Sequence, residues 1–187
     1  GIFQFKIHNK YLLNIPIRIH VNGSRGKSSV VRLIAAGLRE GGLKTYAKTT
    51  GTSPRIIDDK GEDKYIHRLR SASIGEQISL IRYFSKLNPD ALVIECMAVN
   101  PQYQWVSEQK IIKSTIGVLT NVRPDHLDEM GISMNQITQS MSNTIPFNGI
   151  MVTSEDKKVY ILTNISNQRN TEFYLADVEF KNNDLNN

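Results

Sequence analysis

The chain has 187 residues, of which 40% are hydrophobic and 22% charged, and this balance supports the packed core of one domain. Its one cysteine, Cys96, excludes an intrachain disulfide framework and indicates a reducing compartment. No stretch reaches the roughly 20 apolar residues of a membrane-spanning helix. The net charge of +5 is concentrated in the first third of the chain, which suits nucleic acid, phosphates or an acidic small substrate without choosing among them.

The spacing of apolar residues predicts strands and helices that alternate along the chain. Strands are expected at 17–22, 43–48, 91–96, 114–121, 149–154 and 172–177, and helices at 27–40, 73–87, 101–112, 133–144 and 155–169. Residues 55–70 are polar and are interpreted as a hairpin or an excursion. This order predicts an α/β fold with a mostly parallel sheet and helices on both faces.

The first expected strand runs into a glycine-rich loop from which a helix opens. The loop comprises Gly23, Ser24, Arg25, Gly26, Lys27, Ser28 and Ser29. Its glycines let the backbone approach a phosphate, and the helix N-terminus adds about half a positive charge. Lys27 should face solvent in the empty site and reach the terminal phosphates of a nucleotide, and the Ser28 hydroxyl should ligate Mg²⁺. The common phosphate-loop pattern has Gly where this chain has Val21, so a plain Gly/Ser turn is the alternative.

Two acidic features follow later strands of the expected sheet. Glu95 closes a continuous apolar run, and His126 lies in the acidic segment Asp125–Asp128 after the next strand. Ligands of open α/β sheets bind beyond the carboxyl ends of the strands, so these features and the loop should meet at one rim. Ser28, Glu95 and His126 are therefore candidate ligands of Mg²⁺ or Mn²⁺. Taken singly, a strand-end Glu is more often a solvated or ion-paired carboxylate, and a lone His is more often structural.

Other side chains capable of chemistry are interpreted as structural. The remaining histidines, His8, His20 and His67, have no comparable context. Cys96 is expected to be a small buried residue. Tyr103 and Trp105 are expected to pack the helix at 101–112 against the sheet.

Taken together, these segments resemble the central ATPase domain of the Mur ligases and folylpolyglutamate synthases. The resemblance rests on GSRGKSS after a strand, on a later strand that ends in Glu95, and on TNVRPDHLD. Within that superfamily the chain is similar to the ligase subunit of poly-γ-glutamate (capsule) synthases. The similar segments are IPIRIHVNGSRGKSSVVRL, KTTGTSPRII, IGEQ, ECMAVNPQYQ, GVLTNVRPDHLDEMG and TIPFNG, across roughly residues 15–150. ECMAVNPQYQ is the most telling, because generic Mur ligases do not carry it.

The resemblance implies an ATP-dependent amide ligase. ATP would phosphorylate a carboxylate of glutamate or of a growing γ-glutamyl chain, and the amine of another amino acid would displace the phosphate. Lys27 and the loop amides would hold the β- and γ-phosphates, Ser28, Glu95 and His126 would hold Mg²⁺, and Lys27, Glu95 and His126 would be the catalytic residues. The implied partners are membrane subunits of a capsule synthase complex, with this chain soluble at the cytoplasmic face of a bacterial membrane.

The resemblance also sets the expected domain organisation. Residues 1–16 would be a lead-in after an absent membrane anchor, 17–180 a Mur-like ATP-binding domain truncated at its C-terminal end, and 181–187 a frayed tail. Because the chain begins with Gly1, we expect it to be a piece of a longer protein. Mur ligases carry a carbamylated lysine on the helix after the DH motif. The corresponding stretch ISMNQITQSMSNTI has no lysine, so a second metal site of that kind is not expected.

Two functions from other classes remain open. A kinase-like phosphotransferase or a GTPase-like switch would also use a phosphate loop, although the sequence lacks the guanine-reading NKxD motif of GTPases. A non-catalytic nucleotide-binding subunit of a membrane complex predicts no nucleotide hydrolysis and no Mg²⁺ dependence. Nucleic-acid binding ranks lower, because the basic residues are not clustered with aromatic ones on an obvious face.

Overall fold

The structure is a computed structural model that describes residues 2–51, 53–66 and 74–176. Within these ranges a single sheet has the strand order β4-β3-β2-β5-β1-β6-β7-β8. The strands are β1 (Ile17–Asn22), β2 (Thr45–Thr49), β3 (Arg55–Ile57), β4 (Asp63–Tyr65), β5 (Ala91–Glu95), β6 (Ile116–Leu119), β7 (Ile150–Thr153) and β8 (Glu172–Leu175). Every pairing from β2 to β8 is parallel, and the pairings β2–β3 and β3–β4 are antiparallel. The predicted α/β sheet is confirmed, and the expected hairpin is β3–β4.

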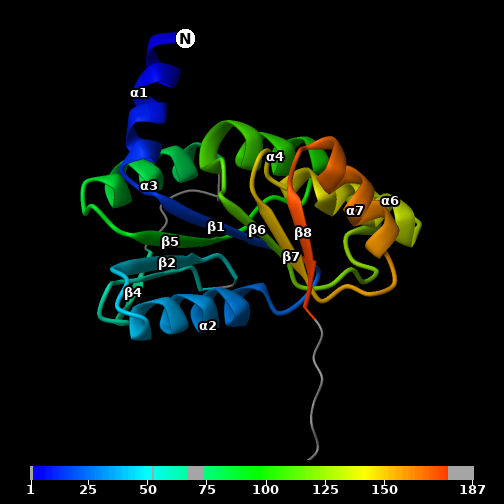
Figure 1. Cartoon of the computed structure of the whole chain (residues 1–187), viewed down its shortest axis with the longest axis horizontal. Helices are drawn as coiled ribbons and strands as arrows, with labels where there is room; N and C mark the ends of the chain where they lie inside the picture. Colours follow the sequence, from blue (N-terminus) through cyan, green and yellow to red (C-terminus); the bar gives the residue numbers. More distant parts are fainter. Residues whose placement is uncertain (1, 52, 67–73, 177–187) are drawn as a thin grey trace, which may run out of the picture.

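Helices cover both faces of this sheet, as predicted. They are α1 (Ile2–Leu13), α2 (Lys27–Glu40), α3 (Ile74–Ser85), α4 (Pro101–Val106), the π-helix η1 (Ser107–Ile112), α5 (Leu127–Met130), α6 (Met134–Met141), the 3₁₀ turn η2 (Ser142–Thr144) and α7 (Val159–Gln168). Helix α2 lies on one face, and α3, α4, α6 and α7 lie on the other (Figure 1). In the described ranges no helix combines the length and apolarity needed to cross a membrane.

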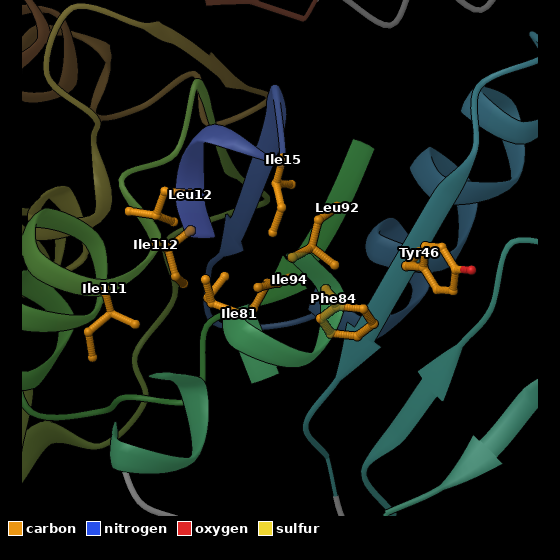
Figure 2. Packing of buried hydrophobic residues seen from close by; sticks show 9 residues of the cluster. All are labelled: Leu12, Ile15, Tyr46, Ile81, Phe84, Leu92, Ile94, Ile111 and Ile112. Atoms are coloured by element: carbon orange, nitrogen blue, oxygen red, sulfur yellow. The ribbon is translucent and has the colours of Figure 1, made fainter. Parts of the chain in front are cut away.

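Apolar clusters pack against both faces of the sheet. Side chains alternate along a strand, so Ile19 and Val21 point toward α2, where they pack with buried apolar residues such as Val31. On the other face α3, η1 and the end of α1 bury a second cluster (Figure 2). Its members are Leu12, Ile15, Tyr46, Ile81, Phe84, Leu92, Ile94, Ile111 and Ile112. The sheet is therefore anchored by apolar packing on both sides.

The lead-in 1–16 contains a helix, α1, to which the sequence analysis assigned no element. Its sequence, IFQFKIHNKYLL, has no clear apolar repeat at helical spacing, so periodicity could not reveal it. It extends away from the sheet (Figure 1), and near its C-terminal end Leu12 is buried in the core with Tyr11 packed against it. His8 Nε2 lies 2.7 Å from the carbonyl oxygen of Ile111 and ties the helix to η1. Tertiary contacts therefore hold this helix in place.

The helix expected at 101–112 begins as an α-helix and then widens into a π-helix. The side chain of Asn100 caps α4 by accepting from Gln102 N at 3.0 Å, and Pro101 occupies the first turn. The expectation for the aromatic residues was wrong, since Tyr103 is 57% exposed and Trp105 is 38% exposed. The fully buried residue between them is Gln104. This helix therefore presents a polar side chain to the sheet. His67 and the expected tail at 181–187 lie outside the described residues.

Candidate functional site

The carboxyl ends of three central strands meet at one edge of the sheet, because β1 lies between β5 and β6. A cavity of about 210 Å³ opens there. Its polar lining includes the loop residues Gly23, Ser24 and Lys27 together with Glu95, Asp125 and His126. The rest of the lining comes from Asn22 at the end of β1, from Thr50 and Gly51 after β2, from the segment 96–99 after β5, and from Met130 and Met141. The three features that the sequence placed at one rim therefore border one cavity.

The glycine-rich loop is held against the segment that follows β6. Gly23 has φ +136°, and a Cβ there would lie 2.1 Å from Thr120 Oγ1, so only glycine fits. Ser24 N donates to the carbonyl oxygen of Asn121 at 3.1 Å. Thr120 Oγ1 donates to the carbonyl oxygen of Arg25 at 2.7 Å. The position of the loop is therefore fixed by contacts about 100 residues away in the sequence.

Helix α2 begins without a side-chain cap. Its N-cap is Gly26, which is in the left-handed region at φ 81° and has no side chain to accept from the first turn. The first N–H groups of a helix need acceptors, and together with the helix dipole they favour an anion. A second hollow at this point, of about 280 Å³, is lined by the loop from Ser24 to Ser29 and by Glu95. The geometry therefore offers an anion-binding cradle.

Lys27 does not point freely into solvent as expected. Its Nζ donates to the carbonyl oxygen of Gly23 at 2.7 Å, and the residue is half-buried. This contact folds the side chain back over its own loop, so the ammonium lies beside the cradle. A phosphate in the cradle would replace a neutral carbonyl by a charged acceptor, which makes a stronger hydrogen bond.

Glu95 is the buried carboxylate of the site. Its Oε2 accepts from Ser28 Oγ at 2.8 Å and from the main-chain N–H of Thr50 at 2.8 Å. Both donors are neutral, and no ion pair with Glu95 is found within the described part of the chain. A buried carboxylate usually has a positive partner. The donor set of Ser28 and Glu95 therefore suits a divalent cation.

His126 lines the same cavity as the loop. Its backbone is left-handed at φ 45°, and its side chain is 52% exposed. The neighbouring carboxylate of Asp125 lies 3.8 Å from His126 Nε2 and accepts from Arg25 Nη1 at 3.1 Å. Asp125 therefore links the histidine segment to the loop.

The structure brings most of the predicted site residues together. Lys27, Glu95 and His126 line one cavity, and Ser28 is hydrogen-bonded to Glu95 from the adjoining hollow. No group of three His, Cys, Asp or Glu side chains capable of holding a metal occurs among the described residues. The predicted set contains only two such side chains, so its role as a metal site stays a prediction.

Sequence reasoning missed the part that Thr50 plays at this site. The residue acts on Glu95 through its main-chain N–H, and a main-chain donor leaves no signature in residue type. The turn chemistry of TTGTSP was the available signal, since it places this loop directly after a strand.

The fold and the loop define an α/β protein whose first sheet strand leads through a glycine-rich anion cradle into a helix. The profile of the Mur ligase middle domain matches residues 21–186, and the chain belongs to this family. It is 40% identical over 181 residues to capsule biosynthesis protein CapB of Bacillus anthracis, covering 95% of this chain and 39% of that protein. It is 39% identical over 179 residues to PGA synthase CapB of Bacillus subtilis (strain 168), covering 95% of this chain and 46% of that protein. The chain thus spans less than half the length of these relatives.

Solved structures share the fold at low sequence identity. E. coli FolC in complex with ADP has a TM-score of 0.69 at 15% identity, covering 96% of this chain and 48% of that one. A bifunctional folylpolyglutamate synthase/dihydrofolate synthase with Mn, AMPPNP and L-glutamate bound has a TM-score of 0.69 at 16% identity, covering 94% of this chain and 47% of that one. At this identity the likeness establishes a common fold.

Proposed function

We propose that this chain is the ATP-binding part of an ATP-dependent ligase that joins amino acids through γ-glutamyl amide bonds. The observation that carries the proposal is the uncapped start of α2 beside the buried Glu95–Ser28 pair, in a chain of the Mur ligase middle domain family. An anion cradle next to a carboxylate that has no positive partner among the described residues suits a nucleotide that arrives with a divalent cation. The names of the two CapB relatives support capsule or PGA synthesis as the process.

Ser28, Glu95 and His126 would hold Mg²⁺ or Mn²⁺ at this site. The residues fit such an ion, because a carboxylate, a hydroxyl and an imidazole are accepted ligands and the two donors that Glu95 Oε2 accepts from, Ser28 Oγ and Thr50 N, are neutral. The bound cation would neutralise charge on the phosphates. The folylpolyglutamate synthase structure with Mn and AMPPNP supports a metal–nucleotide pair in this fold.

The chain's own residues would act on the phosphates. The loop amides from Gly23 to Ser29 and the ammonium of Lys27 would hold the β- and γ-phosphates of ATP. A carboxylate of glutamate or of a γ-glutamyl chain would attack the γ-phosphorus, forming an acyl phosphate and releasing ADP. The amine of a second amino acid would then attack the acyl carbon, forming the amide and releasing phosphate. Holding the two reactants together and excluding water favour the amide over hydrolysis.

The proposed partners are the other subunits of a membrane-bound capsule synthase, with this chain at the cytoplasmic face of the membrane. The names of the two relatives support capsule synthesis as the setting, and the membrane subunits follow from the family resemblance alone. The proposed substrates are ATP and glutamate or a γ-glutamyl chain, and nucleic acid is not among the proposed ligands.

Replacement of Lys27 tests the phosphate role. Lys27→Ala should weaken ATP binding in the presence of Mg²⁺ roughly tenfold or more, because a hydrogen bond to a charged group contributes about 1.5–3 kcal/mol. The matched control is Lys44→Ala, whose Nζ donates to the carbonyl oxygen of Leu87 at 2.6 Å, away from the cavity. Calorimetric titration with ATP measures both. Equal affinity in wild type and Lys27→Ala would overturn the phosphate-loop assignment.

A second assay separates the ligase from the alternatives. The chain is incubated with ATP, Mg²⁺ and glutamate, and γ-linked products are sought by mass. Since the chain spans less than half of its relatives, we expect Mg²⁺-dependent nucleotide binding and slow hydrolysis at most. Binding without hydrolysis or Mg²⁺ dependence would support a non-catalytic subunit, and a phosphorylated product stable to amines would support a kinase-like phosphotransferase. Robust polymer would contradict the view that this chain is only the ATP-binding part.

A further inference from the structure

The segment ECMAVNPQYQ, residues 95–104, ends in a buried glutamine, Gln104. Gln104 is fully buried under the sheet, and both ends of its amide are used. Its Oε1 accepts from Asn22 Nδ2 at 2.9 Å. Its Nε2 donates to the carbonyl oxygen of Val99 at 2.7 Å and to Ser140 Oγ at 3.3 Å. One side chain thus contacts the end of β1, the segment after β5, and helix α6.

Asn22 carries this connection into the glycine-rich loop. Its Oδ1 accepts from the main-chain N–H of Gly23, the first loop residue, at 2.8 Å. Its Nδ2 also lies 3.2 Å from Thr144 Oγ1 and 3.5 Å from the carbonyl oxygen of Met141. The residue is buried, at 3% exposure, at the edge of the cavity. Hydrogen bonds therefore fix the orientation of both polar atoms of the Asn22 amide.

The segments joined by the two amides all border the cavity. Gly23, Val99 and Met141 line it, and they come from three separate parts of the chain. Hydrogen bonds are directional, so a buried pair with every polar atom engaged fixes relative positions more narrowly than apolar packing does. Breaking one contact leaves a buried polar group unsatisfied and releases the segment attached to it.

We propose that Asn22 and Gln104 are positioning residues, which hold the start of the phosphate loop in register with the Val99 and Met141 walls of the cavity. They act through the main-chain N–H of Gly23 and the carbonyl oxygen of Val99. The proposal rests on the proposed function in one respect, since it takes a nucleotide as the ligand whose affinity reports the position of the loop relative to the cavity walls. The geometric part, a shared restraint on the loop and the segment 97–100, holds for any anion in the cradle.

The test compares two buried glutamines on the same side of the sheet. Gln104→Met removes both arms of the amide at similar length. Gln77→Met is the matched control, since Gln77 is equally buried and accepts from Ser107 Oγ at 2.7 Å, but does not line or adjoin the cavity. Each variant is titrated with ATP plus Mg²⁺ and with inorganic tripolyphosphate. Amide hydrogen exchange is followed over residues 23–29 and 97–100 without ligand.

Gln104→Met should weaken binding of ATP and of tripolyphosphate by the same factor, roughly threefold to tenfold, and Gln77→Met should change neither. Exchange should rise together in segments 23–29 and 97–100 of Gln104→Met and stay at the wild-type rate in Gln77→Met. Unchanged exchange in either segment of Gln104→Met would overturn the proposal. Wild-type protein that binds neither probe would defeat the proposed function, whereas the exchange result would still decide the positioning role.

A milder pair of variants covers the case in which Gln104→Met does not fold. Thr144→Val removes the hydroxyl that accepts from Asn22 Nδ2. Thr138→Val is its control, because Thr138 is fully buried nearby and donates only within its own helix, to the carbonyl oxygen of Met134 at 2.6 Å. Faster exchange at residues 23–29 in Thr144→Val alone supports the proposal. Equal exchange in the two variants contradicts it.

Discussion

The two faces of β1 are packed by different forces. Toward α2, Ile19 and Val21 join an apolar cluster with Val93. Toward α4 and η1, His20 and Asn22 meet buried polar partners. Apolar packing is non-directional and tolerates small shifts, whereas a buried polar contact is costly when broken and fixes geometry. Apolar packing therefore provides the contact between β1 and α2, whereas directional contacts on the opposite face restrain the relative positions of the cavity walls.

The largest effect is expected from removing Glu108, the buried acid that contacts His20 on the α4 and η1 side of β1. Glu108 Oε2 lies 2.7 Å from His20 Nδ1, and Glu108 Oε1 accepts from the main-chain N–H and the hydroxyl of Ser114. Glu108→Leu should lower the free energy of unfolding by about 3–5 kcal/mol, because it leaves a buried partner unpaired. Urea denaturation measures this. Glu155→Leu should lower the free energy of unfolding by less, because Glu155 accepts from the neutral main-chain N–H groups of Val122 and Lys157 and leaves no charged partner behind.

A second test uses pH to weaken the same pair. Burial opposes protonation of His20, but the neighbouring Cys96 and Glu108 outweigh it and raise the pKa of His20 to about 9. The folded state then binds more protons than the unfolded state between the ordinary pKa of 6.5 and about 9. The stabilisation is complete below pH 6.5 and is lost as pH rises to 9, by up to about 3 kcal/mol. His20→Gln should flatten this slope in denaturation measured at several pH values. Parallel slopes in the two proteins would refute the coupling.

The smallest expected change in function comes from the apolar face. Val93 is fully buried between β1 and β2, and Val93→Ala should lower the free energy of unfolding by roughly 1–3 kcal/mol through lost burial and a small cavity. Affinity for ATP should stay within about twofold of wild type, because Val93 does not line the cavity. Titration and thermal unfolding of the same sample give both numbers. A loss of affinity as large as that of Gln104→Met would erase the distinction between the faces.

Much of the fold could be predicted from sequence because its strands are short, apolar and separated by helical repeats. The run ALVIE is buried along its whole length as β5, in line with its composition. The helix α1 could not be predicted, because its apolar residues lack a helical period. The aromatic residues of α4 were wrongly expected to pack inward, because an aromatic side chain is expected to be buried more often than an amide. The buried residue is Gln104, and its hydrogen-bond partners Ser140 and Asn22 lie 36 and 82 residues away, beyond any local pattern.

The candidate site was predictable where it depends on local motifs and strand ends. GSRGKSS and Glu95 meet as expected, since both follow strands that turn out to be adjacent. The side chain of Lys27 could not be placed, because its contact with Gly23 depends on the loop's own curvature. His20 was interpreted as ordinary, and its Nδ1 lies 2.7 Å from the buried carboxylate of Glu108, 88 positions further along. Pairing at such separation depends on the tertiary fold.

The central position of β1 has a consequence for how the chain folds. Ile17 pairs with Ala91 and Ile19 pairs with Ile116, so both neighbours of the first sheet strand are made long after it. Contacts between distant residues slow folding, because a long loop must close before they form. During synthesis, β1 would leave the ribosome with both edges open and would wait for residues beyond 116. The anion cradle can therefore be assembled only after the segment that follows β6 has been made, and until then β1 presents two unpaired edges to chaperones and to other chains.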